Sequence, residues 1–128
     1  MARYLLDTNV LISSSKQREP AYSWVLDRTR SPDELSACDI VVTEFFAGLP
    51  PGERPTWERF FGAMSYWETS FEAARQAGLY RYRYTRQGQI IASSDALIAA
   101  VSVSVRAIII TGNVRHYPMS DVVLLPLS

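Results

Sequence analysis

The sequence predicts an α/β fold with a mostly parallel central sheet of four to five strands. Apolar runs of strand length alternate with longer segments of helical periodicity, which is typical of repeated βα units. The chain has 128 residues, of which 48% are hydrophobic, so it has the size of one domain and enough apolar material for a core. We therefore expect residues 1–128 to form a single domain and exclude intrinsic disorder.

The first half of the chain contains two predicted strands, each followed by a helix. The first strand is Tyr4–Leu6, and it stops at Asp7-Thr8-Asn9, whose side chains can cap the next helix. Pro20 can open a second helix. The β-branched run Ile40–Val42 predicts the second strand, and Thr43-Glu44 stands where that strand would pass into another helix.

The second half continues the alternation. Met64–Glu68 predicts a short strand, Phe71 to about Tyr84 predicts a helix, and Ser93-Ser94-Asp95 predicts a helix start. Ala107–Ile110 and Val122–Leu125 predict the last two strands. A helical stripe of large apolar side chains before these elements is expected to pack in the core or in a dimer. The stripe consists of Trp57, Phe60, Phe61 and Met64.

Charge and cysteine content exclude several classes of protein. Thirteen basic and thirteen acidic residues give a net charge of zero, which excludes a nonspecific polycation, although acids dominate residues 1–74 and arginines residues 75–128. Cys38 is the only cysteine, so neither an intrachain disulfide nor a thiolate zinc site is expected. The apolar-rich stretch Ala96–Ile110 is shorter than the roughly 20 residues of a spanning helix. We therefore expect a cytoplasmic protein with no membrane contact.

Three acids stand at predicted strand ends or helix starts. Asp7 ends the first strand, Glu44 ends the second, and Asp95 lies in the first turn of the helix that leads into Ala107–Ile110. Asn113 follows that last strand. In a parallel α/β sheet these positions share one edge, where ligands bind. Taken singly, each acid is better explained as a helix-terminal residue, which contributes about 0.3–1 kcal/mol.

Convergence of the three acids favours a bound cation. Two carboxylates at 4 Å repel by about 4 kcal/mol at an effective dielectric constant of about 20, more than helix caps offset. Oxygen ligands, in a chain with one cysteine and one histidine, select Mg²⁺ or Mn²⁺ over zinc or copper. Such an ion activates water and neutralises charge on a phosphoryl oxygen. The pattern therefore indicates phosphodiester hydrolysis.

Four blocks of the sequence resemble the motifs of PIN domains, and their order and spacing resemble those of VapC-type toxin ribonucleases. The resemblance extends from about Tyr4 to Leu125. It implies a three-layer α/β/α fold, a Mg²⁺- or Mn²⁺-dependent endoribonuclease of a toxin-antitoxin pair, a cognate VapB-like antitoxin and a homodimer. The blocks are LLDTNVLI at 5–12, VTE at 42–44, SDALIAA at 94–100 and ITGNVRHY at 110–117.

The resemblance also implies roles for single residues. Asp7, Glu44 and Asp95 match the acids of the family, which makes them the expected metal ligands and catalytic residues. Asn9 accompanies Asp7 and is a candidate substrate contact. Thr8 is interpreted as a helix cap, with a hydrogen bond to a carboxylate as the alternative.

The last block departs from the family pattern. Many members have a further acid there, where this chain has Asn113 and His116. Three acids are enough for one metal, whereas a second needs the substrate phosphate as a bridging ligand. Asn113 is a catalytic candidate that can hold a metal-bound water, and Thr111 is a candidate substrate contact. His116 is either a proton shuttle or phosphate contact, or a surface side chain.

The segment Tyr80–Arg86 alternates aromatic and basic residues, which suits single-stranded RNA held by stacking and by phosphate contacts. We list Arg81, Arg83 and Arg86 as candidate substrate contacts. Helical spacing separates Arg81 from Arg83 by about 200°, so the equal alternative is a solvated helix end with tyrosines lying over the core. An antitoxin segment is a further possible occupant of this surface.

The leading hypothesis is a metal-dependent endoribonuclease that uses Asp7, Glu44 and Asp95. A first alternative is a catalytically weak or inactive PIN-like module that binds RNA or protein. A second alternative is a phosphotransfer domain with Asp7 as the nucleophile. The second is weak, because the chain has no phosphate-binding GxxxxGK[ST] loop and its only lysine, Lys16, lies in the first helix region.

Overall fold

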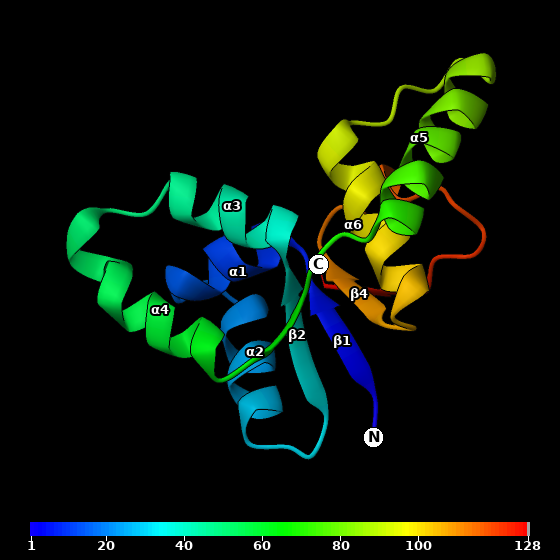
Figure 1. Ribbon diagram of the computed structural model, residues 1–128. Coiled ribbons are helices and arrows are strands. Elements are labelled where there is room, and N and C mark those ends of the chain that lie inside the picture. Colours follow the sequence, from blue (N-terminus) through cyan, green and yellow to red (C-terminus); the bar gives the residue numbers. More distant parts are fainter. Residues whose placement is uncertain (128) are drawn as a thin grey trace.

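The computed structural model describes residues 1–127 and contains one five-stranded, fully parallel sheet (Figure 1). The strands are β1 (Arg3–Leu6), β2 (Glu34–Cys38), β3 (Ser65–Trp67), β4 (Ile108–Thr111) and β5 (Leu124–Pro126), in the order β3-β2-β1-β4-β5. The helices are α1 (Thr8–Ser15), α2 (Ala21–Thr29), α3 (Asp39–Ala47), α4 (Arg54–Gly62), α5 (Phe71–Arg86) and α6 (Ser93–Ser104), with 3₁₀ turns η1 (Pro51–Glu53) and η2 (Val114–His116). The predicted α/β class and parallel sheet are confirmed.

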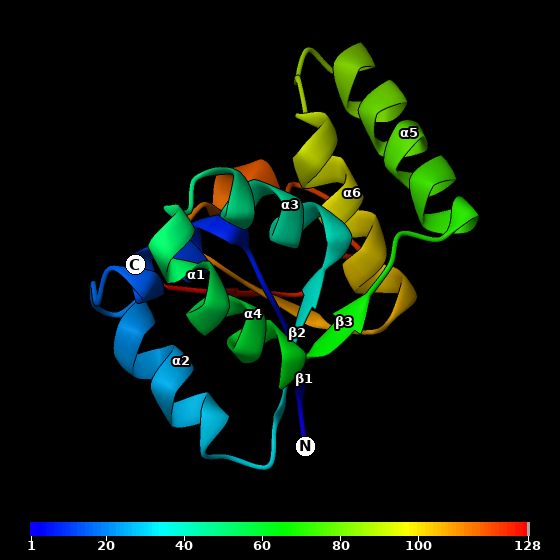
Figure 2. The same cartoon turned by 60° about the vertical axis from the view of Figure 1, so that its left-hand side comes forward.

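The helices cover both faces of the sheet. Figure 1 shows α5 and α6 on one side and α1, α2 and α4 on the other, and Figure 2 shows α5 as the outermost helix of its side. Leu5 and Leu6 of β1 and Ile109 and Ile110 of β4 are completely buried, because the central strands are covered on both faces. The three-layer α/β/α arrangement is therefore confirmed, and β1, at the centre of the sheet, lies where the strand order reverses.

One predicted strand is wrong. Ile40–Val42 forms the start of helix α3, and the second strand is the preceding segment Glu34–Cys38. A short apolar run fits a strand and a buried helix equally well. Tertiary packing selects the helix, because Val41 and Phe45, four residues apart, bury one face of α3. The Asp39 carboxylate accepts a hydrogen bond from the Ile40 amide at the start of this helix.

The other predicted elements are present with small shifts. The strand within Met64–Glu68 is β3, the helix from Phe71 extends to Arg86, and the last strand starts two residues later than predicted. The aromatic stripe of α4 packs within the chain, since the rings of Trp57 and Phe45 lie edge to face with centroids 5.1 Å apart. Core packing therefore explains this stripe. None of the helices in residues 1–127 has both the length and the hydropathy needed to span a bilayer.

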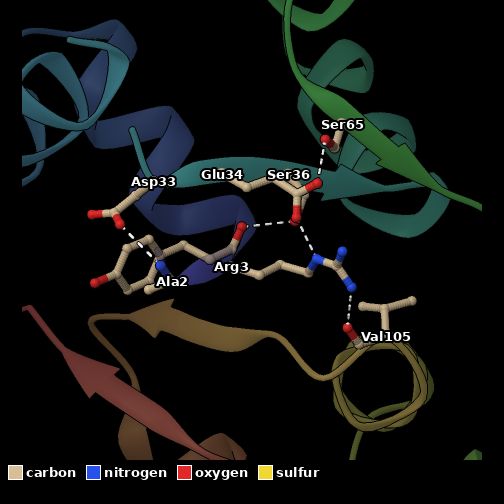
Figure 3. A network of polar contacts seen from close by, with 8 residues as sticks. Ala2, Arg3, Asp33, Glu34, Ser36, Ser65 and Val105 are labelled. Carbon is tan, nitrogen blue, oxygen red and sulfur yellow. Dashed lines mark hydrogen bonds and ion pairs between the residues drawn. The ribbon is translucent and has the colours of Figure 1, made fainter. Parts of the chain in front are cut away.

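A polar network closes the amino-terminal edge of the sheet, opposite the carboxyl ends of the strands (Figure 3). The Arg3 guanidinium is paired with the Glu34 carboxylate and also donates to the carbonyl of Val105 at the end of α6. Ser65 of β3 donates to the same carboxylate at 2.8 Å. These bonds hold the pKa of Glu34 below its usual value. The network joins three strands and leaves the opposite edge for chemistry.

Candidate active site

Asp7 is the most buried acid of the site. It follows β1, caps α1, and is only 4% exposed. One carboxylate oxygen accepts from the Thr8 amide at 2.7 Å and the other from the Thr111 hydroxyl at 2.8 Å. Burial nevertheless raises the pKa of Asp7 above its usual value, because these bonds replace only part of the lost hydration. Asp7 is thus both a helix cap and a destabilised charge that a cation would stabilise.

Glu44 reaches the site from a different element than the sequence predicts. It lies in the middle of helix α3, not at the end of a strand. Its exposed carboxylate accepts a hydrogen bond from the Thr8 hydroxyl at 2.7 Å. The predicted position at a strand end is therefore wrong. The interpretation of Thr8 as a helix cap is also wrong, because Asp7 caps the helix and receives the Thr8 amide, while the Thr8 hydroxyl donates to a carboxylate, which was the alternative.

Asp95 lies in the first turn of α6, as predicted. Its carboxylate is 3.3 Å from Nδ1 of His116, so His116 contacts the site although half of its side chain is exposed. Partial burial raises the pKa of Asp95; the His116 charge opposes this shift, and the charges of Asp7 and Glu44 add to it. Asp95 therefore lies within electrostatic reach of both Asp7 and Glu44, and the three carboxylates belong to one site.

The acids are neighbours, but they do not form a closed metal cage. Within residues 1–127, no three His, Cys, Asp or Glu side chains are close enough together to surround an ion. The hydroxyls of Thr8 and Thr111 each donate to one oxygen, of Glu44 and of Asp7 respectively. The available donors are oxygens, the type that Mg²⁺ and Mn²⁺ prefer. The residues therefore fit a hard divalent cation.

The loop after β4 links the carboxylates to open surface. The Thr111 hydroxyl is completely buried and joins Asp7 to the Asn113 amide, which donates to it at 2.9 Å. Two hollows meet at Gly112 and Asn113. One, of about 450 Å³, is lined by Arg115 and His116; the other, of about 260 Å³, is lined by Asn9. Asn9 and Asn113 thus lie beside the acids, whereas Thr111 contacts Asp7 and is closed to solvent.

Tyr117, the last residue of the block ITGNVRHY, is a site residue that no sequence pattern indicated. Its side chain is 3% exposed, and its hydroxyl has no hydrogen-bond partner at standard geometry. The hydroxyl is close enough to Asp7 to lower the pKa of that acid. Burial and the charges of Asp7 and Asp95 raise the pKa of Tyr117 far above its usual value. Tyr117 therefore presents a neutral, unpaired donor beside Asp7.

We expect Tyr117→Phe to raise the free energy of unfolding of the metal-free protein by about 1 kcal/mol, because a buried hydroxyl without a standard hydrogen bond costs about 1–3 kcal/mol and its contact with Asp7 offsets only part of that cost. Urea unfolding followed by circular dichroism measures this change. Tyr84→Phe is the matched control, because it removes a hydroxyl that donates to the Pro118 carbonyl, and it should lower stability. A destabilised Tyr117→Phe would mean that the hydroxyl has a partner in solution.

The arginines of α5 do not form one track. The helix continues to Arg86, so Arg81 and Arg83 face different directions. Arg81 donates to the Ile91 carbonyl at 2.9 Å, and Arg86 lies over the Tyr82 ring at 3.3 Å from its centroid. Tyr80 and Tyr84 are buried, which matches the predicted alternative of tyrosines lying over the core. RNA contacts by Arg81, Arg83 and Arg86 stay a prediction.

Comparisons with known proteins agree with this architecture. Residues 4–121 match the PIN domain family. Ribonuclease VapC19 of Mycobacterium tuberculosis is 30% identical over 115 residues, which cover 90% of this chain and 92% of that protein. Ribonuclease VapC2 of Haemophilus influenzae is 26% identical over 123 residues, which cover 91% of each chain.

Two solved structures have the same fold. The structure of VapBC2 from Rickettsia felis bound to a promoter DNA fragment superposes with a TM-score of 0.82 at 20% identity, covering 98% of this chain and 99% of the other. VapBC-1 from nontypeable Haemophilus influenzae gives a TM-score of 0.81 at 22% identity and 97% coverage of both. Because the family match spans nearly the whole chain and a 30% identical relative covers it equally well, the chain belongs to the PIN domain family and groups with the VapC ribonucleases.

Proposed function

We propose that this chain is a Mg²⁺- or Mn²⁺-dependent endoribonuclease and the toxin of a toxin-antitoxin pair. One observation carries the catalytic part: Asp7, Glu44 and Asp95 come from three different elements and share one electrostatic site. Burial raises the pKa of Asp7, and burial together with the charges of Asp7 and Glu44 raises the pKa of Asp95. Such a site is costly for the fold unless it has a use, and cation binding is the use that its oxygen donors suit best.

Asp7, Glu44 and Asp95 would hold the metal. A bound divalent ion lowers the pKa of water and offsets the charge that develops on the phosphate during in-line attack. Thr8 and Thr111 keep two of the carboxylates oriented by hydrogen bonds of 2.7 and 2.8 Å. His116 is placed at 3.3 Å from Asp95, where its imidazole can accept or return a proton.

Arg115 and Asn113 are the proposed contacts to the RNA next to the metal ligands. Both line the open hollow of about 450 Å³ that His116 also borders. A guanidinium binds phosphate through paired N–H groups, and Asn113 can orient a water or a phosphate oxygen. Arg81, Arg83 and Arg86 remain proposed contacts to more distant phosphates. An RNA substrate would make the cytoplasm the site of action.

The proposed protein partner is a VapB-like antitoxin. The support is that relatives with the same fold were solved as VapBC complexes and that a ribonuclease acting on cellular RNA requires control. We also propose a homodimer, for which exposed Phe71, Leu79 and Tyr82 on the outer helix α5 supply apolar surface.

The test is RNA cleavage by the purified protein freed from any antitoxin. We expect cleavage with Mn²⁺ or Mg²⁺, its complete loss with EDTA, and its recovery when the metal is restored. Glu72→Gln, a change to an exposed acid in the first turn of α5, should cleave like the original protein. Cleavage that persists in EDTA would refute the proposal. RNA binding without calorimetric Mn²⁺ binding would instead identify a noncatalytic binding module.

A further inference from the structure

A second hollow shares Gly112 and Asn113 with the one used above, and the proposed chemistry uses none of its other lining residues. It has a volume of about 260 Å³ and lies between the start of α1, the start of α2 and the loop after β4. The residues of interest in its lining are Asn9, Ser13, Glu19, Gly112 and Asn113. Asn113 connects it to the site, because the Asn113 amide and Asp7 bind the same Thr111 hydroxyl. The hollow is thus two hydrogen bonds away from the most buried carboxylate.

The polar groups of this hollow are free to bind a ligand. Within residues 1–127, the side chains of Asn9, Ser13 and Asn113 make no hydrogen bond to protein. Together they offer two amide groups and one hydroxyl, each of which both donates and accepts. The volume is just below the roughly 300–1,000 Å³ of sites for drug-sized ligands, so a single flat ring system suits it better than a larger group.

Glu19 is the one charged side chain in this lining, and its carboxylate is held in place. The Ser23 amide donates to one oxygen at 2.8 Å and the Ser23 hydroxyl donates to the other. These bonds lower the pKa of Glu19, so it is ionised at neutral pH. A carboxylate has about four acceptor positions on its two oxygens, so at least one position on each oxygen remains open. The hollow is thus lined by one carboxylate held by Ser23 and by the neutral side chains of Asn9, Ser13 and Asn113.

This combination discriminates among RNA bases. Guanine presents N1–H and the N2 amino group side by side, which a carboxylate accepts as a pair, and its O6 and N7 accept from amide N–H groups. Adenine, cytosine and uracil each place an acceptor nitrogen or oxygen next to their donor, and a carboxylate repels that acceptor. A free carboxylate with amide donors therefore favours guanine.

We propose that the hollow binds a guanine base of the RNA next to the cleaved phosphate, with Glu19 accepting from N1–H and the N2 amino group and Asn9 and Asn113 donating to the opposite edge. The proposal rests on the ribonuclease function proposed above and adds to it a substrate preference. Glu19 and Ser13 act here in recognition and have no part in holding the metal.

The experiment compares short RNAs that differ at one guanosine near the cleavage site. Inosine lacks only the N2 amino group, so we expect kcat/KM to fall by about tenfold or more for inosine in the original protein. Glu19→Gln should cleave the guanosine and inosine RNAs at equal rates, with unchanged Mn²⁺ binding by calorimetry. Glu72→Gln, an equal change to an exposed acid far from the hollow, should keep the original preference.

Binding of guanosine 5′-monophosphate in EDTA gives a second readout that needs no catalysis. We expect calorimetric binding of this nucleotide by the original protein, weaker binding of inosine monophosphate, and loss of binding in Ser13→Leu, which fills the hollow. The proposal is overturned if Glu19→Gln keeps the preference for guanosine over inosine. It is also overturned if the original protein cleaves RNA without that preference. Absence of any cleavage with Mn²⁺ would overturn the ribonuclease function itself, and guanosine monophosphate binding would still test the hollow separately.

Discussion

Asp7→Asn is expected to lower the rate of RNA cleavage by on the order of 10³-fold, the scale seen when a key electrostatic group is removed from an active site. An amide has no charge for the cation and offers one oxygen, whereas the carboxylate uses two oxygens to bind Thr8 and Thr111 and supplies the charge. Single-turnover cleavage at saturating Mn²⁺ measures the effect on the chemical step.

The same substitution should stabilise the metal-free protein. Asp7 is 4% exposed and its pKa is raised by burial, so its charge opposes folding at neutral pH. Asparagine keeps one acceptor for the Thr8 amide and can donate to the Thr111 hydroxyl. Asp27→Asn, at an exposed position of α2, is the matched control and should change neither activity nor stability. More than a tenth of the original activity in Asp7→Asn would exclude Asp7 as a metal ligand.

Addition of Mn²⁺ should raise the melting temperature of the original protein by on the order of 10 °C. A ligand at 100 times its Kd stabilises the folded state by about 2.7 kcal/mol, and for a chain of this size each kcal/mol shifts the midpoint by several degrees. The cation neutralises the repulsion that raises the pKa of Asp95. Asp7→Asn should lose most of this rise. Equal stabilisation of both proteins would place the ion elsewhere.

The metal-free protein should show the cost of holding these buried carboxylates as anions in the pH dependence of its stability. The folded-state pKa values of Asp7 and Asp95 lie above the ordinary 3.8, so the folded state holds these protons more tightly than the unfolded state. The protonated carboxyls of Asp7 and Asp95 therefore stabilise the folded state. This stabilisation is complete below pH 3.8 and is lost as the pH rises through the folded-state pKa values of the two acids. Glu19 and Glu34 have lowered pKa values and act in the opposite direction.

The free energy of unfolding is measured against pH for Asp7→Asn and for the original protein. Subtracting one curve from the other cancels the contributions of Glu19 and Glu34, because the two proteins share these groups. In EDTA, the difference should grow more unfavourable to the original protein from about pH 4 upward and then level off. Urea unfolding at a series of pH values measures it. A difference that shrinks with rising pH would mean that Asp7 is stabilised as an anion in the metal-free state.

Local patterns were sufficient for most of the fold. Apolar strand runs next to polar helix starts predicted β1, β3, β4 and the helices that begin at Thr8, Phe71 and Ser93, because caps and hydrophobic periodicity act over a few residues. The same signals located Asp7 after β1 and Asp95 in the first turn of α6. The positions of these two acids could be predicted without knowing which residues contact them in the fold.

Contacts between distant segments explain what the patterns missed. Ile40–Val42 is helical because Val41 and Phe45 bury one face of α3, so Glu44 comes from a helix and depends on Thr8, 36 residues earlier, for its orientation. The unpaired hydroxyl of Tyr117 beside Asp7 likewise leaves no trace in a local pattern.

The chain order of acids and strands was thus enough to indicate the class of fold and to predict an oxygen-ligated ion, which stays a prediction. The particular partners of each carboxylate were not. A hydrogen bond such as that from Thr111 to Asp7 joins residues 104 positions apart, and the hollow beside them combines α1, α2 and the loop after β4. Such juxtapositions arise from packing of the whole core, whose free energy is spread over many residues and is encoded in no single segment.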